Sequence, residues 1–504
     1  MDRSSNDSSA IDSEIRQRIR PITGRFTRPF GRPLVAHLAP GIWLVVLVAI
    51  GFGASFYSSH LEGLTLVPFA FDSASSFAIN YEVYHVAAET AQSGGDFYDA
   101  PPERLSADYV YLYPPITLLA FYPFTLFEVA QGFLLATLTS MLAGAASTWA
   151  VVAYVEDHGR RLGWLDVALI FAFFVGSLYA AGTVVFGNVN LWLAGLLSIG
   201  FLALLRGREM VAGVAFALAA LFKLFPALVG IWLLRVRAWR ATAGAIATGI
   251  GGLLFGLVLF GREQTTFYFR EVVAGRSESE AFVGGYGVGE LNYVTVQRPV
   301  SWLVWTVYPG ASTGWLYATT AVVLAGFLAF FYADLSRPMD RHAAIFATTA
   351  AAVVAFPALR WYVVLLYLPI LVLAYCWEGP GYPFLVAGVV VFSTSPHPRD
   401  VYAVLESGIA PWWLETADGY VPLVDLLATF DLLAPLLQPF APLAALGTTQ
   451  LWGIALIALG CAISKVAAGT DPVSAYRQWR AGEGSLSLLE GITPPYGPGT
   501  PRDD

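Results

Sequence analysis

The sequence contains little charge. Of its 504 residues, 13% are charged and 57% are hydrophobic, whereas soluble globular proteins carry about 25% charged residues. Half the usual charge does not cover the surface of water-facing domains in a chain of this length, and the apolar residues are spread along the whole chain. The composition therefore excludes a set of soluble domains and indicates a polytopic membrane protein.

Cysteine, histidine and lysine are also scarce. The two cysteines, Cys376 and Cys461, both lie in apolar runs, which excludes a disulfide scaffold or a zinc ribbon. The six histidines are scattered without metal-ligand spacing, so no metal or other cofactor is predicted. A net charge of −8 argues against a nucleic-acid partner. Only two of the 28 basic residues are lysines, Lys223 and Lys465.

Apolar runs predict an all-α integral membrane protein with about twelve transmembrane helices. A hydrocarbon core about 30 Å thick is crossed by roughly 20 helical residues, whose backbone groups are satisfied internally. The predicted spans lie near residues 34–57, 129–154, 163–182, 188–205, 241–260, 313–333, 343–358, 361–376, 382–394 and 443–466. Two shorter runs, 209–221 and 224–234, predict a broken hairpin with Lys223 at its tip.

Arginine clusters orient this bundle. They fall in alternate gaps between spans: Arg16/Arg18/Arg20, Arg160/Arg161, Arg206/Arg208, Arg235/Arg237/Arg240 and Arg337/Arg341. Because positive charge marks the cytoplasmic side, this alternation predicts that both termini are cytoplasmic. The predicted organisation is a basic N-terminal tail (1–33), a membrane domain (34–466) and a disordered C-terminal tail (467–504).

Three long loops fill the other gaps, at residues 58–128, 261–312 and 395–442. The first and third are rich in acidic residues and nearly free of arginine, so all three are predicted on the outer face of the cell membrane. Their many aromatic residues are typical of segments that lie at the level of the lipid headgroups. Within the first loop, residues 80–92 predict an interfacial helix with Tyr84, Ala87, Ala88 and Ala91 on one face.

Several short motifs follow one another along the chain. They are Asn80-Tyr81-Glu82-Val83-Tyr84, Gly94-Gly95-Asp96-Phe97-Tyr98, Tyr111-Leu112-Tyr113-Pro114-Pro115, Gly187-Asn188-Val189-Asn190, Phe222-Lys223-Leu224-Phe225-Pro226 and Phe356-Pro357-Ala358-Leu359-Arg360-Trp361-Tyr362. In this order they resemble glycosyltransferase family 87, membrane enzymes of the C-type (GT-C) fold that take sugars from polyprenyl-phosphate donors.

The resemblance implies a GT-C bundle with interfacial helices in its outer loops. It also implies a hexosyltransferase, with a mannose-like sugar, that needs no metal and acts on a lipid-linked glycan, a glycolipid or a surface glycan. Two positions depart from the family pattern. The loop aspartate that the family uses as catalytic base aligns with Asn80. The histidine usual in the family's late motif is absent here, where residues 360–362 are Arg, Trp and Tyr.

Sugar transfer from a lipid phosphate requires a carboxylate that deprotonates the acceptor hydroxyl. Because an amide at position 80 does not accept a proton, Glu82 and Asp72 are the nearest candidates for the base. Glu82 is favoured, since it lies inside the motif and one helical step from His85, although either acid could be a solvated loop residue. Asn80 and His85 are then candidate substrate-binding residues, together with Tyr113 of the Tyr-Pro-Pro motif.

The reaction also requires cations to hold the departing phosphate, whose charge grows in the transition state. Lys223 lies in an apolar stretch, where an ionisable group is costly unless it is paired or hydrated. We therefore expect it to bind the donor phosphate; an internal ion pair or a snorkelling side chain is the alternative.

Four further residues are candidates at the same site. Arg298 and Arg360 are predicted phosphate ligands on the outer side, with contact to membrane lipid headgroups as the alternative. Asn188 and Asn190 either hydrogen-bond sugar hydroxyls or cap the helix that begins near Leu191.

Two other functions compete with the transferase. A transporter or lipid flippase would explain the broken hairpin with its buried lysine, because transporters build sites from discontinuous helices. It explains the aromatic outer loops less well, and no repeat relates the two halves of the chain. A catalytically inactive relative that binds glycolipid is the second alternative, because of Asn80.

Overall fold

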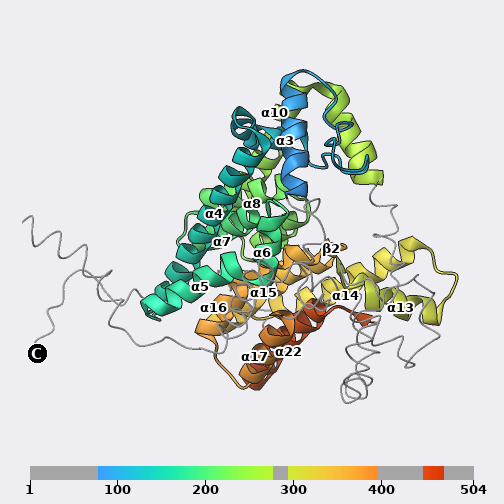
Figure 1. The fold of residues 1–504 in the computed structure, drawn as a ribbon. Coiled ribbons are helices and arrows are strands. Elements are labelled where there is room, and N and C mark those ends of the chain that lie inside the picture. Colours follow the sequence, from blue (N-terminus) through green and yellow to red (C-terminus); the bar gives the residue numbers. More distant parts are fainter. Residues whose placement is uncertain (1–77, 276–292, 394–445, 470–504) are drawn as a thin grey trace, which may run out of the picture.

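The computed structural model describes residues 78–275, 293–393 and 446–469 (Figure 1). The two predicted tails, the predicted first span and its following segment with Asp72, and the third outer loop lie essentially outside these residues. Within the described ranges the chain is mostly helical, with a single antiparallel pair of two-residue strands, β1 (Tyr293–Val294) and β2 (Ala358–Leu359).

The helical elements follow in chain order. They are α3 (Ile79–Gln92), η2 (Pro115–Ala120), η3 (Tyr122–Leu126), α4 (Val129–Asp157), α5 (Trp164–Gly176), α6 (Leu178–Val185), α7 (Asn190–Leu205), α8 (Glu209–Phe222), η4 (Phe225–Leu228), α9 (Val229–Arg235), α10 (Trp239–Phe267), η5 (Tyr268–Ala274), α13 (Gln297–Val307), α14 (Thr313–Tyr332), α15 (Pro338–Val354), η6 (Arg360–Leu366), α16 (Tyr367–Cys376), α17 (Tyr382–Ser393) and α22 (Thr449–Ala467).

Four helical stretches in the described part are long and apolar enough to cross a membrane: α4, α10 together with η5, α14 and α22. The pair α5 and α6, bent by 47°, can be counted as a fifth span. The other apolar helices are shorter, including α7, α8, α16 and α17. The protein is thus a helical membrane protein, and the number of about twelve spans stays a prediction.

The predicted hairpin around Lys223 is present. Helix α8 ends at Phe222, and Lys223 has an extended backbone (φ −143°, ψ 128°). Pro226 lies in the first turn of η4, where its missing N–H leaves no helical hydrogen bond unmade. After the hairpin the chain comes back to the start of α8. There Oε2 of Glu209 accepts a hydrogen bond of 3.0 Å from the backbone N–H of Arg240, at the start of α10.

Arginines of the basic clusters make contacts between helices at the end of the bundle that lies away from Lys223. Arg206, after α7, forms an ion pair of 2.7 Å with Asp157 at the end of α4. Arg235, at the end of α9, donates a hydrogen bond of 3.0 Å to the carbonyl of Tyr332 at the end of α14. Helix α8 separates these contacts from Lys223 by about 21 Å, since each helical residue rises 1.5 Å.

The terminal helix joins the same end. Lys465 Nζ donates a hydrogen bond of 2.6 Å to the carbonyl of Asp334 and lies 3.7 Å from Asp340 Oδ1. Asp340 also accepts two hydrogen bonds from Arg337, at 2.7 and 2.8 Å. Lys465 is therefore part of a charge network that packs α22 against the start of α15.

The helix predicted over residues 80–92 is present as α3, at the top of Figure 1; its interfacial position stays a prediction. Tyr84, Ala87 and Ala88, which the sequence pattern places on one face of this helix, are buried. The second predicted outer loop is partly helical: the backbone is kinked and non-helical at Gly261 (φ 83°, ψ 171°), and beyond the kink a second helical stretch of α10 runs to Phe267 and η5 to Ala274. Helix α13 follows in the same predicted loop.

A histidine pair joins α4 to α15 at the basic end. His158, directly after α4, donates from Nδ1 to the carbonyl of Tyr154 (2.8 Å), and its Nε2 lies 3.2 Å from His342 Nε2. Burial lowers the pKa of His158 below 6.5, and Arg341 acts in the same direction, while the hydrogen bond to Tyr154 and the charge of Asp157 oppose them. The folded state therefore takes up this proton at a lower pH than the unfolded chain does.

From this shift we expect the protein to lose stability as the pH falls below about 6.5, because the unfolded state then binds the additional proton. Thermal unfolding in detergent at pH 7.5 and 5.5 measures the loss. The variant His158→Gln is expected to lose less stability over the same interval. Equal losses in both proteins would contradict the assignment to His158.

Candidate active site

Lys223 lies at the centre of the candidate site. Its side chain is buried, with 7% of its surface exposed. The ammonium Nζ donates hydrogen bonds to Asn188 Oδ1 (3.2 Å) and Asn190 Oδ1 (2.8 Å). Three residues that the sequence analysis selected from two separate motifs are thus in direct contact.

Two aromatic rings complete the surroundings of this ammonium group. The centroid of the Tyr362 ring is 3.5 Å from Lys223 Nζ, and that of Tyr113 is 5.9 Å away. Both distances lie within the range of cation–π attraction. Phe225, just beyond the break in the hairpin, stacks on Tyr362 with ring centroids 5.6 Å apart, which fixes the ring beneath the lysine.

The turn between α6 and α7 presents the two asparagines. Helix α7 begins at Asn190, and its N-cap residue is Val189, which has no side-chain capping bond. The capping role that was the alternative for Asn188 and Asn190 is therefore wrong, since their side-chain oxygens accept from Lys223 instead. Asn190 Nδ2 is buried and has no hydrogen-bond partner within the described residues, which leaves a donor beside the lysine.

Helix α3 docks on the same turn. The backbone N–H groups of Ala78 and Asn80 donate to the carbonyls of Val185 (2.8 Å) and Phe186 (2.9 Å). Asn80, the position of the family's aspartate, therefore lies at the turn that carries Asn188.

A second link joins α3 to the lysine through two tyrosines. The hydroxyl of Tyr84, on α3, is 2.9 Å from that of Tyr113, whose ring lies near Lys223. Burial raises the pKa of Tyr84 well above its ordinary value, with a smaller contribution from Tyr113. The Tyr84 hydroxyl thus stays protonated at neutral pH and is able to act as a hydrogen-bond donor or acceptor.

Gly187 is required where α3 meets the turn. Its φ is +66°, and a Cβ atom there would lie 2.5 Å from Tyr81 Cβ. We expect Gly187→Ala to destabilise the protein by about 1–3 kcal/mol and to loosen α3. Gly94→Ala is the matched control, since Gly94 has φ +79° but nothing within 4 Å of the added methyl group. Thermal unfolding of both variants tests this, and equal destabilisation would contradict a role for the contact with Tyr81.

The two other candidates on α3 have partners of their own. The Glu82 carboxylate forms an ion pair with Arg104, and 12% of its side chain is exposed. His85 is buried; its Nε2 donates to the carbonyl of Phe127 (3.2 Å), and its Nδ1 is 3.5 Å from Glu89 Oε2. His85 thus contacts the chain that leads into α4, whereas Asp72 lies outside the described residues.

Arg298 and Arg360 are both buried, each with 5% of its surface exposed. Arg360 begins η6, two residues before Tyr362, and its guanidinium lies 4.7 Å from the ring of Trp361. Arg298 is in the first turn of α13, directly after Gln297, whose Nε2 donates to the carbonyl of Ala355 (3.1 Å). The pairing of β1 with β2 thus brings both arginines to the segment that leads into η6.

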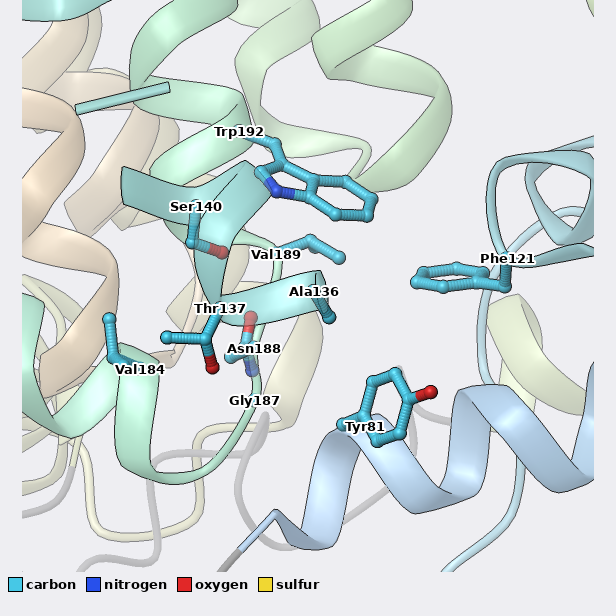
Figure 2. A pocket seen from close by; sticks show the side chains of 10 residues that line it. All are labelled: Tyr81, Phe121, Ala136, Thr137, Ser140, Val184, Gly187, Asn188, Val189 and Trp192. Atoms are coloured by element: carbon cyan, nitrogen blue, oxygen red, sulfur yellow. The ribbon is translucent and has the colours of Figure 1, made fainter. Parts of the chain in front are cut away.

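A small cavity of about 10 Å³, room for about one water molecule, adjoins Asn188 (Figure 2). Figure 2 shows the ring of Trp192 at the top and that of Tyr81 at the bottom, with the side chains of Asn188 and Thr137 at a height between them. Within the described residues, Thr137 Oγ1 and Trp192 Nε1 are buried without a hydrogen-bond partner. The cavity therefore adds polar groups next to the asparagine that holds Lys223.

Sequence reasoning did not assign roles to Tyr362, Tyr84 or Arg104. Tyr362 lies in the late motif and Tyr84 on the helix face that the sequence analysis described, but nothing in the sequence showed which residues these tyrosines contact. No pattern in the sequence pointed to the contact of Arg104, because its partner Glu82 is 22 residues away across an irregular segment. In the described ranges no three His, Cys, Asp or Glu side chains gather as metal ligands would.

The fold and the site define a helical membrane protein with a buried cation at the tip of a broken hairpin. The model of glycosyltransferase family 87 matches residues 111–369, which is just over half of the chain. The chain belongs to this family and is a membrane glycosyltransferase. The matched range contains the lysine, both asparagines and both arginines, whereas α3 and Asp72 precede it.

Other comparisons are more distant. No curated protein matches the chain. Two solved structures of ArnT from Cupriavidus metallidurans align with 85% of the chain at a TM-score of 0.29. The apo structure is 17% identical and covered over 78% of its length, and the structure bound to undecaprenyl phosphate is 18% identical and covered over 79%. The family match alone carries the assignment.

Proposed function

We propose that the protein transfers a mannose-like hexose from a polyprenyl-phosphate donor to a lipid-linked glycan, a glycolipid or a surface glycan, on the outer face of the cell membrane. It would do so in a bundle of the GT-C type, as membership of family 87 suggests. One observation carries the proposal: a buried ammonium group, held by Asn188 and Asn190 over the ring of Tyr362, lies where α3 docks.

The contacts of Lys223 suit a phosphate ligand. Among the contacts of its ammonium are the oxygens of Asn188 and Asn190 and two aromatic rings, which orient the ammonium. A phosphate held there gains stabilisation as its negative charge grows. Asn190 Nδ2 offers a further donor, and Arg360 and Arg298 add positive charge at the neighbouring segment.

The reaction would be a single displacement with inversion at the anomeric carbon. The acceptor hydroxyl gives its proton to a carboxylate and its oxygen forms the new bond to the anomeric carbon. The bond from that carbon to the phosphate oxygen breaks, and polyprenyl phosphate leaves with the electron pair. Glu82 is our choice for the base and Asp72 the alternative; Asn80, His85, Tyr113, Asn188 and Asn190 would bind substrate.

The test uses purified full-length protein in liposomes with a polyprenyl-phosphate hexose and glycolipid acceptors. We expect release of polyprenyl phosphate together with an extended acceptor. A flippase would move labelled lipid between leaflets without breaking the sugar–phosphate bond. An inactive relative would bind glycolipid without transfer, and gain of transfer only in Asn80→Asp would favour that alternative.

A further inference from the structure

The ring of Tyr362 lies directly against the ammonium group of Lys223. Its centroid is 3.5 Å from Nζ, whereas the centroid of Tyr113 is 5.9 Å away, near the limit of cation–π attraction. At 3.5 Å, an ammonium in the plane of the ring would overlap the ring atoms, so Nζ lies over the ring face. The face of an aromatic ring carries negative charge density, and the contact is therefore attractive.

The neighbours of Tyr362 hold its ring in this place. Phe225, just beyond the break in the hairpin, stacks on it with centroids 5.6 Å apart and planes inclined by 16°. The preceding residue, Trp361, packs its ring against Phe186 with centroids 5.5 Å apart. It also covers Gly182 of α6 so closely that a Cβ atom there would overlap the ring. The start of η6 is thus anchored both to α6 and to the hairpin.

Lys223 is held by two kinds of contact. Asn188 and Asn190 accept hydrogen bonds from Nζ at 3.2 and 2.8 Å, and the Tyr362 ring faces the same nitrogen. Hydrogen bonds fix the direction of individual N–H groups, whereas the ring attracts the ammonium as a whole. Lysine has a long flexible stem and many rotamers, so the combination of contacts confines the charge to one position.

We propose that Tyr362 is a positioning residue for sugar transfer: the face of its ring holds the Lys223 ammonium where it meets the donor phosphate. This inference rests on the proposed function, in which that phosphate is the ligand of the ammonium. It assigns the effect to the ring and not to the phenol hydroxyl. A cation that is already in place stabilises the charge growing on the phosphate without having to reorganise during the reaction.

Two substitutions separate the ring from the hydroxyl. Tyr362→Phe keeps the aromatic face, so we expect kcat/KM to stay within about threefold of wild type. Tyr362→Leu removes the face and is expected to lower kcat/KM by about 10–30-fold. A loss in Tyr362→Phe as large as that in Tyr362→Leu overturns the proposal, because the hydroxyl would then carry the effect.

A graded series keeps the test valid if Tyr362→Leu unfolds. Phenylalanine with one, two or three fluorine atoms at position 362 keeps the shape of the ring while its face becomes progressively less negative. We expect kcat/KM to fall stepwise with each added fluorine. The same series at Phe216 is the matched control and leaves transfer unchanged, since this buried ring on α8 packs against Phe201, with centroids 5.0 Å apart. Equal activity throughout the series at position 362 overturns the proposal.

A purely structural role is tested by introducing Tyr362→Leu into the Lys223→Met protein. A ring that acts through the ammonium has no further effect once the ammonium is gone. Loosened packing would instead lower kcat/KM by the same factor with and without the lysine. Equal factors in the two backgrounds therefore overturn the proposal.

The contact itself can be measured without any sugar transfer. The chain contains only two lysines, so protein labelled with ¹³C at lysine Cε gives two NMR signals, which Lys465→Met assigns. We expect the ring current to place the Cε proton signal of Lys223 upfield of that of Lys465 in wild type and in Tyr362→Phe, but not in Tyr362→Leu. An unshifted Lys223 signal in wild type overturns the proposal. A shifted signal in wild-type protein that transfers no sugar shows instead that the proposed function has failed.

Discussion

Lys223→Met is expected to lower kcat/KM for the polyprenyl-phosphate sugar by about 10²–10³, the loss typical when one preorganised group that stabilises developing charge is removed. Methionine keeps the length and apolar character of the side chain but not its charge. The ammonium is buried against Asn188, Asn190 and Tyr362, so water does not replace it readily. Steady-state transfer in liposomes measures the loss.

The other lysine supplies the matched control. Lys465 is also buried, but it contacts Asp334 and Asp340 at the basic end of the bundle. Lys465→Met is expected to lower thermal stability, since it weakens the packing of α22, and to leave kcat/KM of the folded fraction within about threefold of wild type. Comparable activity losses in both variants would show that burial of a lysine, and not its place at the hairpin tip, explains the effect.

Folding of Lys223→Met has to be checked separately. Without the ammonium, two buried carboxamide oxygens lose their donor, and each such loss costs about 1–3 kcal/mol. Lys223→Arg keeps the charge but presents a planar fork instead of a compact ammonium, so we expect it to retain part of the activity. Full activity in a well-folded Lys223→Met would contradict a phosphate-binding role.

The second large loss of activity is expected for Glu82→Gln. If Glu82 is the general base, the amide lowers kcat by about 10²–10⁴ and changes KM little, because the acceptor is still bound but its hydroxyl is no longer deprotonated. Single-turnover transfer separates this chemical step from product release. The ion pair with Arg104 holds the carboxylate on the first turn of α3.

Three further variants assign the base. Arg104→Met removes the partner of Glu82 but keeps the carboxylate, so its effect on kcat is expected to be much smaller than that of Glu82→Gln. Asn80→Asp introduces the family's residue at the turn that carries Asn188 and is expected to maintain or raise kcat. If Asp72→Asn abolishes transfer while Glu82→Gln does not, the base is Asp72 and our assignment is wrong.

Local sequence was sufficient for much of the helical pattern. The runs near 129–154, 313–333 and 443–466 correspond to α4, α14 and α22, because long apolar stretches permit little besides a membrane helix. The hairpin was also predictable, since Pro226 and the ionisable Lys223 interrupt two apolar runs. The apolar run near 241–260 ends where α10 is kinked at Gly261, but the apolar pattern did not show the helical stretch that follows the kink, in the segment predicted as a loop.

The lysine and its apolar neighbours mark a functional position in the sequence alone, because a charge in such a stretch is costly and needs partners. The sequence alone did not identify those partners. Tyr362 lies 139 residues further along the chain, and the two asparagines lie more than 30 residues before the lysine. They meet only because η6 and the turn before α7 pack around the hairpin tip.

The sequence by itself determined a helical membrane protein, the place of the buried cation and the family pattern that surrounds it. Tertiary structure decided which neutral groups hold that cation, that α3 docks on the turn at Gly187, and that Glu82 pairs with Arg104. The physical reason is the distance along the chain over which each effect acts. Hydropathy and backbone preference act within a few turns of a helix. Contacts between distant segments depend on how complete helices pack.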